Sequence, residues 1–388
     1  MDVEQILSLL PEGVLEELAV TTKVNRYSKK LQGELVFKLL LHCILSHKDN
    51  SLRTMASAYE SLVFSLLNSD SDKGSIRYSS ISERLSTINP EFFEQLYFIC
   101  VKTYSGVIGE QDAILTRFDS TIVSLSGHLL KTGYQLKGGD AEHLRQLKFT
   151  IGLSEIPTAV FFFHDQEHTS ENIALKEAIL SHQPSKSNTI RVFDRGVTSR
   201  KTHDELTEKK IPFVSRINAN SKQKEITKNG LEKPIETETL LITSDNWVLL
   251  YSTKGKAKYP QRCIKAIQKV GNKEIVFITN IIDLTPSEIT ELYKCRWDIE
   301  VFFKFIKQEL NFSHLINRSE NGIKVMLYVT MIAAILLLVY KKKNNLTGFK
   351  IMKQKFVQEL EKSLVREIVV QCGGSLDIFE KKFGKPPV

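Results

Sequence analysis

Hydrophobic and polar positions divide the chain into a helical first part and a mixed middle part. Residues 1–105 repeat apolar side chains at helical spacing, as in the amphipathic run from Leu31 to His47 and the run that follows Asn89-Pro90 to Tyr104. Ser51 is a residue type that caps helices, and it precedes a further run through Glu60. The pattern predicts an all-helical N-terminal domain over residues 1–105.

From about residue 113, short β-type runs alternate with helical runs. Helices are predicted at Glu171–Ser181 and Thr202–Lys210, and strands are predicted at Ile114–Phe118, Phe149–Leu153, Thr158–Phe163, Thr189–Phe193 and Phe213–Ile217. The second and third of these strands are close enough in sequence to form a hairpin. This order predicts an α/β core, with a mixed sheet and helices on both faces, over residues 106–218 and 282–345.

Between the last of these strands and the next helix lie about seventy residues, too many for a plain connection. Their turns are predicted at Asn229-Gly230, Asp245-Asn246 and Gly271-Asn272, and their strands at Thr237–Thr243, Trp247–Ser252, Arg262–Gln268 and Glu274–Asn280. We therefore expect a β-rich insertion over residues 219–281. It is basic, through Lys222, Lys224, Lys228, Lys254, Lys256, Lys258 and Arg262. That charge suits either a DNA-facing surface or an ordinary solvated hairpin surface.

The stretch from Ser287 to Leu310 predicts one uninterrupted helix. Pro286 suits the start of a helix, and Ser287 and Glu288 place a capping hydroxyl and an acid in its first turn. At about 3.6 residues per turn, one side of the helix carries Tyr293, Arg296, Glu300, Lys304 and Lys307. A neighbouring apolar stripe must face a core. By itself, the polar side is typical of a solvated ion-pair face.

A second apolar segment, Val325 to Tyr340, is shorter than the ~20 residues that a membrane-spanning helix needs. We expect it to be a buried helix, without a membrane. Residues 346–388 are predicted to form a polar, helical C-terminal segment.

Composition narrows the class of protein only slightly. The net charge is +8 and the isoelectric point is near 9.0, which is compatible with an anionic partner. The five cysteines are widely spread and contain no Cys-x-x-Cys pair, which favours a reducing cytosol over disulfides or a zinc site. The chain contains no Walker-type phosphate loop, so ATP is not expected.

Three acids change the interpretation of the helix. Asp119 and Asp194 each follow a predicted strand, where an α/β sheet presents functional groups, and Glu300 lies on the long helix. Carboxylates are the ligands that hard divalent cations prefer. For each aspartate alone, capping of a turn is the commoner role.

The spacing Tyr293-x2-Arg296-x3-Glu300-x6-Lys307 resembles the Tyr-Arg-Glu-Lys signature of bacterial insertion-sequence DDE transposases of the insertion-sequence-four family. Phe118-Asp119-Ser120-Thr121 and the stretch Val192 to Gly196 resemble the two aspartate motifs of that family. The resemblance covers roughly Thr116 to Leu310. It implies a ribonuclease H-like core interrupted by a β-rich insertion.

The resemblance also implies a function and a set of roles. Asp119, Asp194 and Glu300 are expected to be catalytic and to hold Mg²⁺, for which Mn²⁺ can substitute. Expected DNA contacts are Tyr293, Arg296, Lys304, Lys307 and, on a base displaced from the duplex, Trp247. The expected partners are double-stranded DNA, as terminal inverted repeats and target, and a second copy of the chain in a synaptic homodimer. The expected location is the bacterial cytoplasm, at the nucleoid.

The implied reaction is cut-and-paste transposition, with cleavage at the inverted repeats followed by strand transfer. Two other functions remain open: that of an inactive or domesticated DNA-binding relative, and that of a nuclease with the same fold. The helical N-terminal domain is expected to help bind the element's ends, with candidate contacts Arg53, Lys73, Arg77 and Arg84.

Overall fold

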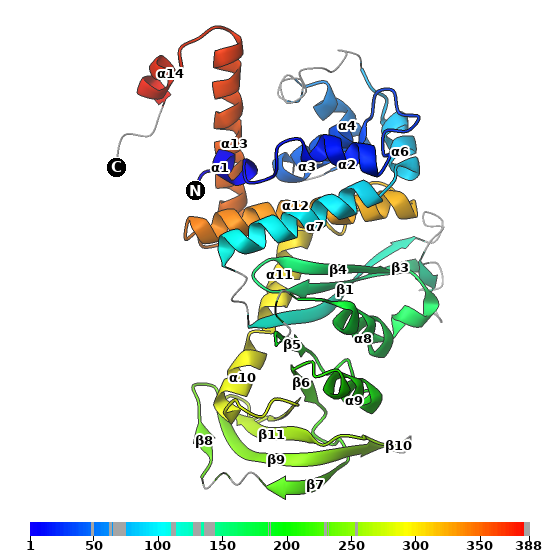
Figure 1. Ribbon diagram of the computed structural model, residues 1–388, viewed down its shortest axis with the longest axis vertical. Helices are drawn as coiled ribbons and strands as arrows, with labels where there is room; N and C mark the ends of the chain where they lie inside the picture. The colour runs from blue at the N-terminus through cyan, green and yellow to red at the C-terminus, as the bar shows by residue number, and fades with distance from the viewer. Residues whose placement is uncertain are drawn as a thin grey trace. The chain divides into compact units, whose positions relative to one another are not determined.

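The computed structural model describes residues 1–47, 50–61, 64, 75–109, 114–126, 133–135, 144–184, 186, 188–228, 231, 233–252 and 255–383 (Figure 1). The chain divides into two compact units. One contains Met1–Ile108 and Lys304–Val388, and the other contains most of Gly109–Phe303. Three sequence predictions lie outside the described residues: the Asn229-Gly230 turn and the candidate contacts Lys73 and Lys254.

The first unit is helical within its described residues. Its N-terminal helices are α1 (Val3–Leu7), α2 (Val14–Thr21), α3 (Gly33–Ser46), α4 (Leu52–Tyr59), α6 (Tyr78–Thr87) and α7 (Glu91–Ile108). The predicted cap is confirmed, since the Ser51 side chain accepts a hydrogen bond from the Thr54 backbone N–H. Arg84, a candidate DNA contact, instead donates to the carbonyl oxygens of Leu31 and Val24 at 2.7 and 2.6 Å, so it serves the packing of this unit.

Three C-terminal helices complete the helical unit: α12 (Glu320–Lys343), α13 (Phe349–Gln371) and α14 (Leu376–Phe383). α12 contains the apolar segment and packs against α7, α3 and α6. It is the one helix in the described part of the chain that is long and apolar enough to cross a membrane, and 89% of its most apolar window is buried inside the protein. A core helix meets the same criterion.

The second unit is built on one mixed, twelve-stranded sheet. Its first strands are β1 (Leu115–Ser126), β2 (Tyr134–Gln135), β3 (Leu144–Leu153), β4 (Pro157–Phe163), β5 (Ile190–Phe193) and β6 (Phe213–Ile217). β3 pairs antiparallel with both β1 and β4, which confirms the predicted hairpin. β5 is parallel to β1 and to β6. The spatial order is therefore β4-β3-β1-β5-β6, and the predicted α/β class with a mixed sheet is confirmed.

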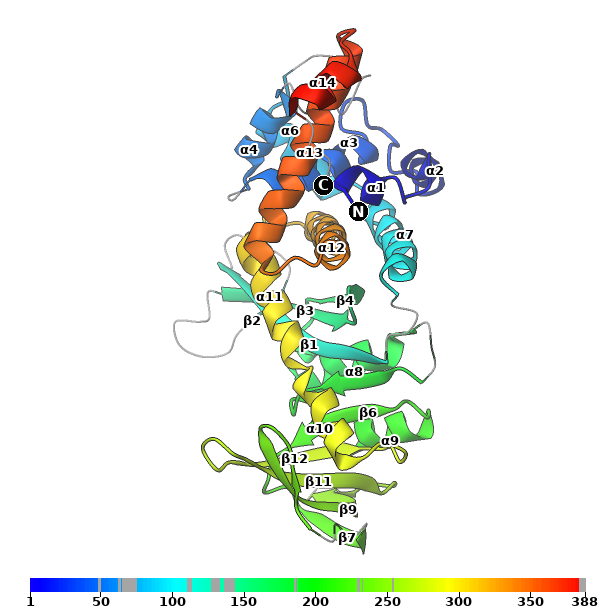
Figure 2. The ribbon, with the colours of Figure 1, turned by 90° about the vertical axis from the view of Figure 1, so that its left-hand side faces the viewer.

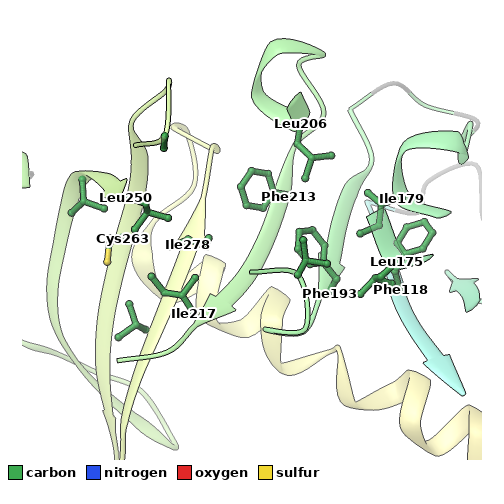
Figure 3. Close-up of a cluster of buried hydrophobic side chains, with 14 of the residues drawn as sticks. Phe118, Leu175, Ile179, Phe193, Leu206, Phe213, Ile217, Leu250, Cys263 and Ile278 are labelled. Carbon is green, nitrogen blue, oxygen red and sulfur yellow. The ribbon is translucent and has the colours of Figure 1, made fainter. Parts of the chain in front are cut away.

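Helices cover both faces of this sheet (Figures 1 and 2). α8 (Glu171–Ser181) and α9 (Arg200–Glu208) pack on one face. Their apolar residues join Phe118, Phe193 and Phe213 in a continuous buried cluster (Figure 3). On the opposite face, Leu115, Val192 and Val214 pack with residues of α10 (Pro286–Lys294). Successive residues of a strand thus alternate between the two cores.

The insertion strands extend the same sheet. They are β7 (Gln223–Lys228), β8 (Ile235–Glu236), β9 (Leu240–Ser252), β10 (Gly255–Lys256), β11 (Gln261–Gln268) and β12 (Glu274–Thr279), and β12 pairs antiparallel with β6. The turn predicted at Asp245-Asn246 is wrong, because β9 runs through it. Asp245 is buried and accepts two hydrogen bonds from Arg262, at 2.9 and 2.7 Å. Arg262 is therefore a buried structural residue and not part of a basic surface.

The helix predicted from Ser287 to Leu310 is two helices, α10 and α11 (Trp297–Glu309), with a junction at Cys295 and Arg296 (Figure 2). Its cap is Thr285 rather than Ser287. The Thr285 side chain accepts from the Glu288 backbone N–H, Glu288 returns the bond, and Pro286 occupies the first helical position. Across the junction the backbone bonds tighten to a spacing of three residues, from Arg296 N to Tyr293 O and from Asp298 N to Cys295 O.

Candidate active site

Asp119 lies inside β1, not beyond its end as the sequence predicts. The strand continues to Ser126, with Asp119 opposite Ile151 of β3. Strand alternation places Asp119 on the face of α10 and α11, while Ser120 points to α8. The Asp119 side chain is 28% exposed. One of its oxygens accepts a 2.8 Å hydrogen bond from the Ser120 backbone N–H.

Asp194 directly follows β5, as predicted. Its carboxylate accepts a 2.8 Å hydrogen bond from the Tyr293 hydroxyl on α10. Tyr293 is buried, with Phe277 against the edge of its ring and Arg216 over its face. Tyr293 therefore holds Asp194 in place, and its hydroxyl is already engaged by that carboxylate.

Arg296, at the α10–α11 junction, links the other two acids. Its guanidinium forms an ion pair with Glu300 one turn later, and one of its nitrogens lies 3.6 Å from an oxygen of Asp119. The Arg296 side chain is only 12% exposed. The three acids that the sequence singles out thus lie around one arginine and one tyrosine, on one face of the sheet.

The two aspartates are perturbed in opposite directions. Burial raises the pKa of Asp119 to about 6, although the Ser120 N–H and Arg296 oppose the shift, and the nearby charges of Glu171 and Asp194 add to it. Burial would also raise the pKa of Asp194. Hydrogen bonds from the Arg195 backbone and Tyr293, with the charges of Arg296 and Arg216, lower that pKa instead. Such opposed shifts within one cluster are typical of functional carboxylates.

The donor set fits a hard divalent cation in its chemistry, since all three acids are carboxylates, the ligand type that such cations prefer. In this structure no three His, Cys, Asp or Glu side chains of the described residues are arranged to hold a metal ion. Arg296 instead supplies the positive charge between Asp119 and Glu300. The acids are therefore gathered but not assembled as a coordination shell.

Sequence reasoning missed two groups beside the acids. Arg117 of β1 contacts the α10–α11 junction. Behind the sheet, the Ser120 hydroxyl donates to Glu171 at 3.1 Å, and the fully buried Lys148 donates to Glu171 at 2.9 Å. Nothing in the sequence marks either group, because each depends on a partner distant along the chain.

The remaining candidate DNA contacts are spread over several elements. Lys304 is exposed on α11, and Lys307 is half-buried, so burial lowers its pKa. Both lysines belong to the helical unit. Trp247 is half-buried in β9. Trp297, at the start of α11, is 61% exposed.

Comparisons with known proteins place the chain in a family. The profile of the family described as the transposase DDE domain matches residues 111–336. A Synechocystis protein named as a transposase for insertion sequence element IS4SA is 26% identical over 76% of this chain and 78% of its own length.

Two further relatives match a smaller part of the chain. A Sinorhizobium fredii protein named as a transposase is 28% identical over 42% of this chain, and a Geobacillus stearothermophilus protein named as a transposase for insertion sequence element IS5377 is 25% identical over 41%. The matches span 45% and 41% of those relatives' own lengths. Since the family profile matches residues 111–336, more than half of the chain, this protein belongs to the transposase DDE domain family.

Proposed function

We propose that this protein is a cut-and-paste DNA transposase that cleaves at the terminal inverted repeats of its element and joins the freed ends to target DNA. The observation that carries the proposal is the gathering of Asp119, Asp194 and Glu300 on one face of the sheet, within the segment that matches the DDE family. Family membership implies divalent-metal dependence, and we propose Mg²⁺ as the metal, with Mn²⁺ able to substitute.

We infer that the core is ribonuclease H-like. The order β4-β3-β1-β5-β6, an antiparallel β1-β3-β4 meander and the parallel β1, β5 and β6 support this inference. So does the connection of β4 to β5 by α8, and of β5 to β6 by α9. The strands between β6 and α10 would then be the family's β-rich insertion.

Asp119, Asp194 and Glu300 would hold the metal ions, which when bound neutralise phosphate charge and activate the attacking oxygen. The protein's own residues have separate tasks. Tyr293 fixes the Asp194 carboxylate through its 2.8 Å hydrogen bond. Arg296 carries a fork of donors suited to a phosphate, and in the absence of metal it keeps the acids from repelling one another.

DNA would be held by positive charge and by stacking. Lys304 and Lys307 follow Glu300 along α11 and suit phosphates as point charges. Trp247 in the insertion remains our proposed base-stacking residue, and the exposed Trp297 is the alternative. We further propose that the protein acts as a homodimer on two synapsed DNA ends, in the bacterial cytoplasm at the nucleoid.

Glu300→Gln tests the proposal. The amide keeps the side-chain shape but removes the charge, so cleavage of a repeat-bearing DNA fragment is expected to be abolished while its binding, measured by gel shift, stays within about threefold of wild type. Equal loss of both would mean that Glu300 is structural. The matched control is Glu291→Gln, an exposed acid on α10, which is expected to leave both measurements unchanged.

A further inference from the structure

Arg117 lies two residues before Asp119 on β1, and both side chains point to the face of α10 and α11. Its three guanidinium nitrogens all have partners. Nε donates to the carbonyl oxygen of Cys295 at 2.7 Å, and Nη1 donates to the carbonyl oxygen of Ser154 at 2.9 Å. Nη2 forms a 2.9 Å ion pair with Asp298. The Arg117 side chain is only 11% exposed, whereas its partner Asp298 is 59% exposed.

These partners come from three different elements. Ser154 lies in the turn between β3 and β4, Cys295 caps the C-terminus of α10, and Asp298 lies in the first turn of α11. Arg117 therefore connects the strand that bears Asp119 to the junction that bears Arg296. Glu300 lies on α11, one helical turn after Arg296.

The contact with Cys295 also explains why the helix is interrupted there. In a continuous α-helix, the Cys295 carbonyl would accept from the N–H four residues later, at Ile299. Instead, that carbonyl accepts from Arg117 Nε and from the Asp298 N–H, while the Ile299 N–H turns to Arg296. The junction thus has a specific external donor, which no sequence pattern of the helix itself contains.

We propose that Arg117 is a positioning residue of this active site, which fixes the α10–α11 junction and so sets Arg296 and Glu300 against Asp119. The expected effect on the cleavage rate rests on the proposed transposase function. The expected effect on the α10–α11 junction rests on the contacts of Arg117 alone. Displacement of catalytic groups by about 1 Å can lower a rate ~100-fold. Loss of Arg117 is therefore expected to lower the cleavage rate by about that factor.

The test variant is Arg117→Met, which keeps the aliphatic stem and removes every donor. We expect the single-turnover cleavage rate on repeat-bearing DNA to fall by ~100-fold, the Mg²⁺ concentration for half-maximal cleavage to rise, and DNA affinity to stay within about threefold, because Arg117 does not face solvent. Arg117→Lys has one donor group for three acceptors and should recover only part of the rate.

Two controls separate positioning from general stability. Arg191→Met removes another buried strand arginine that donates to backbone carbonyls, here of Thr189 and His182, but does not touch the junction. It should lower thermal stability while leaving the rate per folded molecule and the Mg²⁺ dependence unchanged. Asp298→Ala removes only the exposed partner and should change the rate less than threefold.

A spectroscopic measurement tests the structural part without DNA or metal. In a Trp247→Phe background, Trp297 is the remaining tryptophan and lies two residues from Cys295. Arg117→Met should lower its steady-state fluorescence anisotropy, while Arg191→Met should not. If Arg117→Met does not fold, Arg117→Lys is measured in the same way.

The outcomes are distinct. A wild-type rate and Mg²⁺ dependence in Arg117→Met, or a loss that Arg191→Met reproduces, would overturn the proposal. A wild-type protein that cuts no DNA would defeat the proposed function. In that case, an unchanged Trp297 anisotropy would overturn the positioning role, and a lowered one would support it.

Discussion

Asp119→Asn should make the protein more stable at neutral pH. Burial raises the pKa of Asp119 from 3.8 to about 6, so the folded protein binds this proton more tightly than the unfolded chain does. The stability contributed by the protonated carboxyl is fully present below about pH 4 and is lost as the pH rises through 6. Above pH 6, the charged carboxylate therefore costs stability, which asparagine does not.

The magnitude follows from the pKa values. A difference of about 2 pH units at ~1.4 kcal/mol per unit gives ~3 kcal/mol, and relaxation around the partly exposed side chain reduces this to about 1–3 kcal/mol. Urea denaturation in EDTA at pH 8 and at pH 4 measures it. The gain should be present at pH 8 and small at pH 4. Asp165→Asn, an acid with 60% of its side chain exposed, is the control and should show no such gain.

Mg²⁺ should narrow the stability difference between the two proteins. A metal that binds only the folded state at ten times its Kd stabilises it by ~1.4 kcal/mol, and this increment should appear in wild type and be absent from Asp119→Asn. An Asp119→Asn protein that is no more stable than wild type at pH 8 in EDTA would refute the claim that Asp119 is held as a costly buried carboxylate.

Three further predictions concern other residues. Lys307→Ala should weaken DNA binding at low salt and reduce the slope of log affinity against log salt by about one, whereas a defect independent of salt would indicate packing by this half-buried lysine. Asp245→Ala leaves the buried Arg262 without its carboxylate and should lower the free energy of unfolding, measured by urea denaturation, by about 3–5 kcal/mol. A loss below about 1 kcal/mol would contradict the buried ion pair. His203 is fully buried, and burial with the charge of Arg200 lowers its pKa to about 4, so its protonation favours unfolding as the pH falls from 6.5 to 4. Over that pH range, the free energy of unfolding of His203→Leu should therefore fall by about 3 kcal/mol less than that of wild type. Equal losses in the two proteins would show that His203 is not the group responsible.

Local pattern was sufficient to predict most of the elements around the site. The β3–β4 hairpin, α8, β6 and the position of Asp194 after β5 follow from short runs of apolar residues bounded by polar ones. The position of Asp119 inside a strand was not predicted, because Asp119-Ser120-Thr121 consists of residue types that are common in turns. In the fold, those residues pair with β3, and the Ser120 hydroxyl forms hydrogen bonds with Thr150 of β3 and Glu171 of α8.

The other errors also arise from contacts between distant parts of the chain. At the break in the predicted helix, the Cys295 carbonyl accepts a hydrogen bond from Arg117, which lies 178 positions earlier. The predicted turn at Asp245 is a strand because Arg262 neutralises that buried acid. Such contacts leave no trace in the spacing of a single sequence.

The most direct test of the account is strand cleavage of a DNA fragment that carries the inverted repeats flanking this gene, with Mg²⁺, with EDTA and with Asp119→Asn protein. We predict nicking at the repeat boundary that requires both the metal and Asp119. Specific binding without cutting would contradict the catalytic assignment and indicate a DNA-binding relative. Cutting that ignores the repeats would contradict transposition and indicate a nuclease of the same fold.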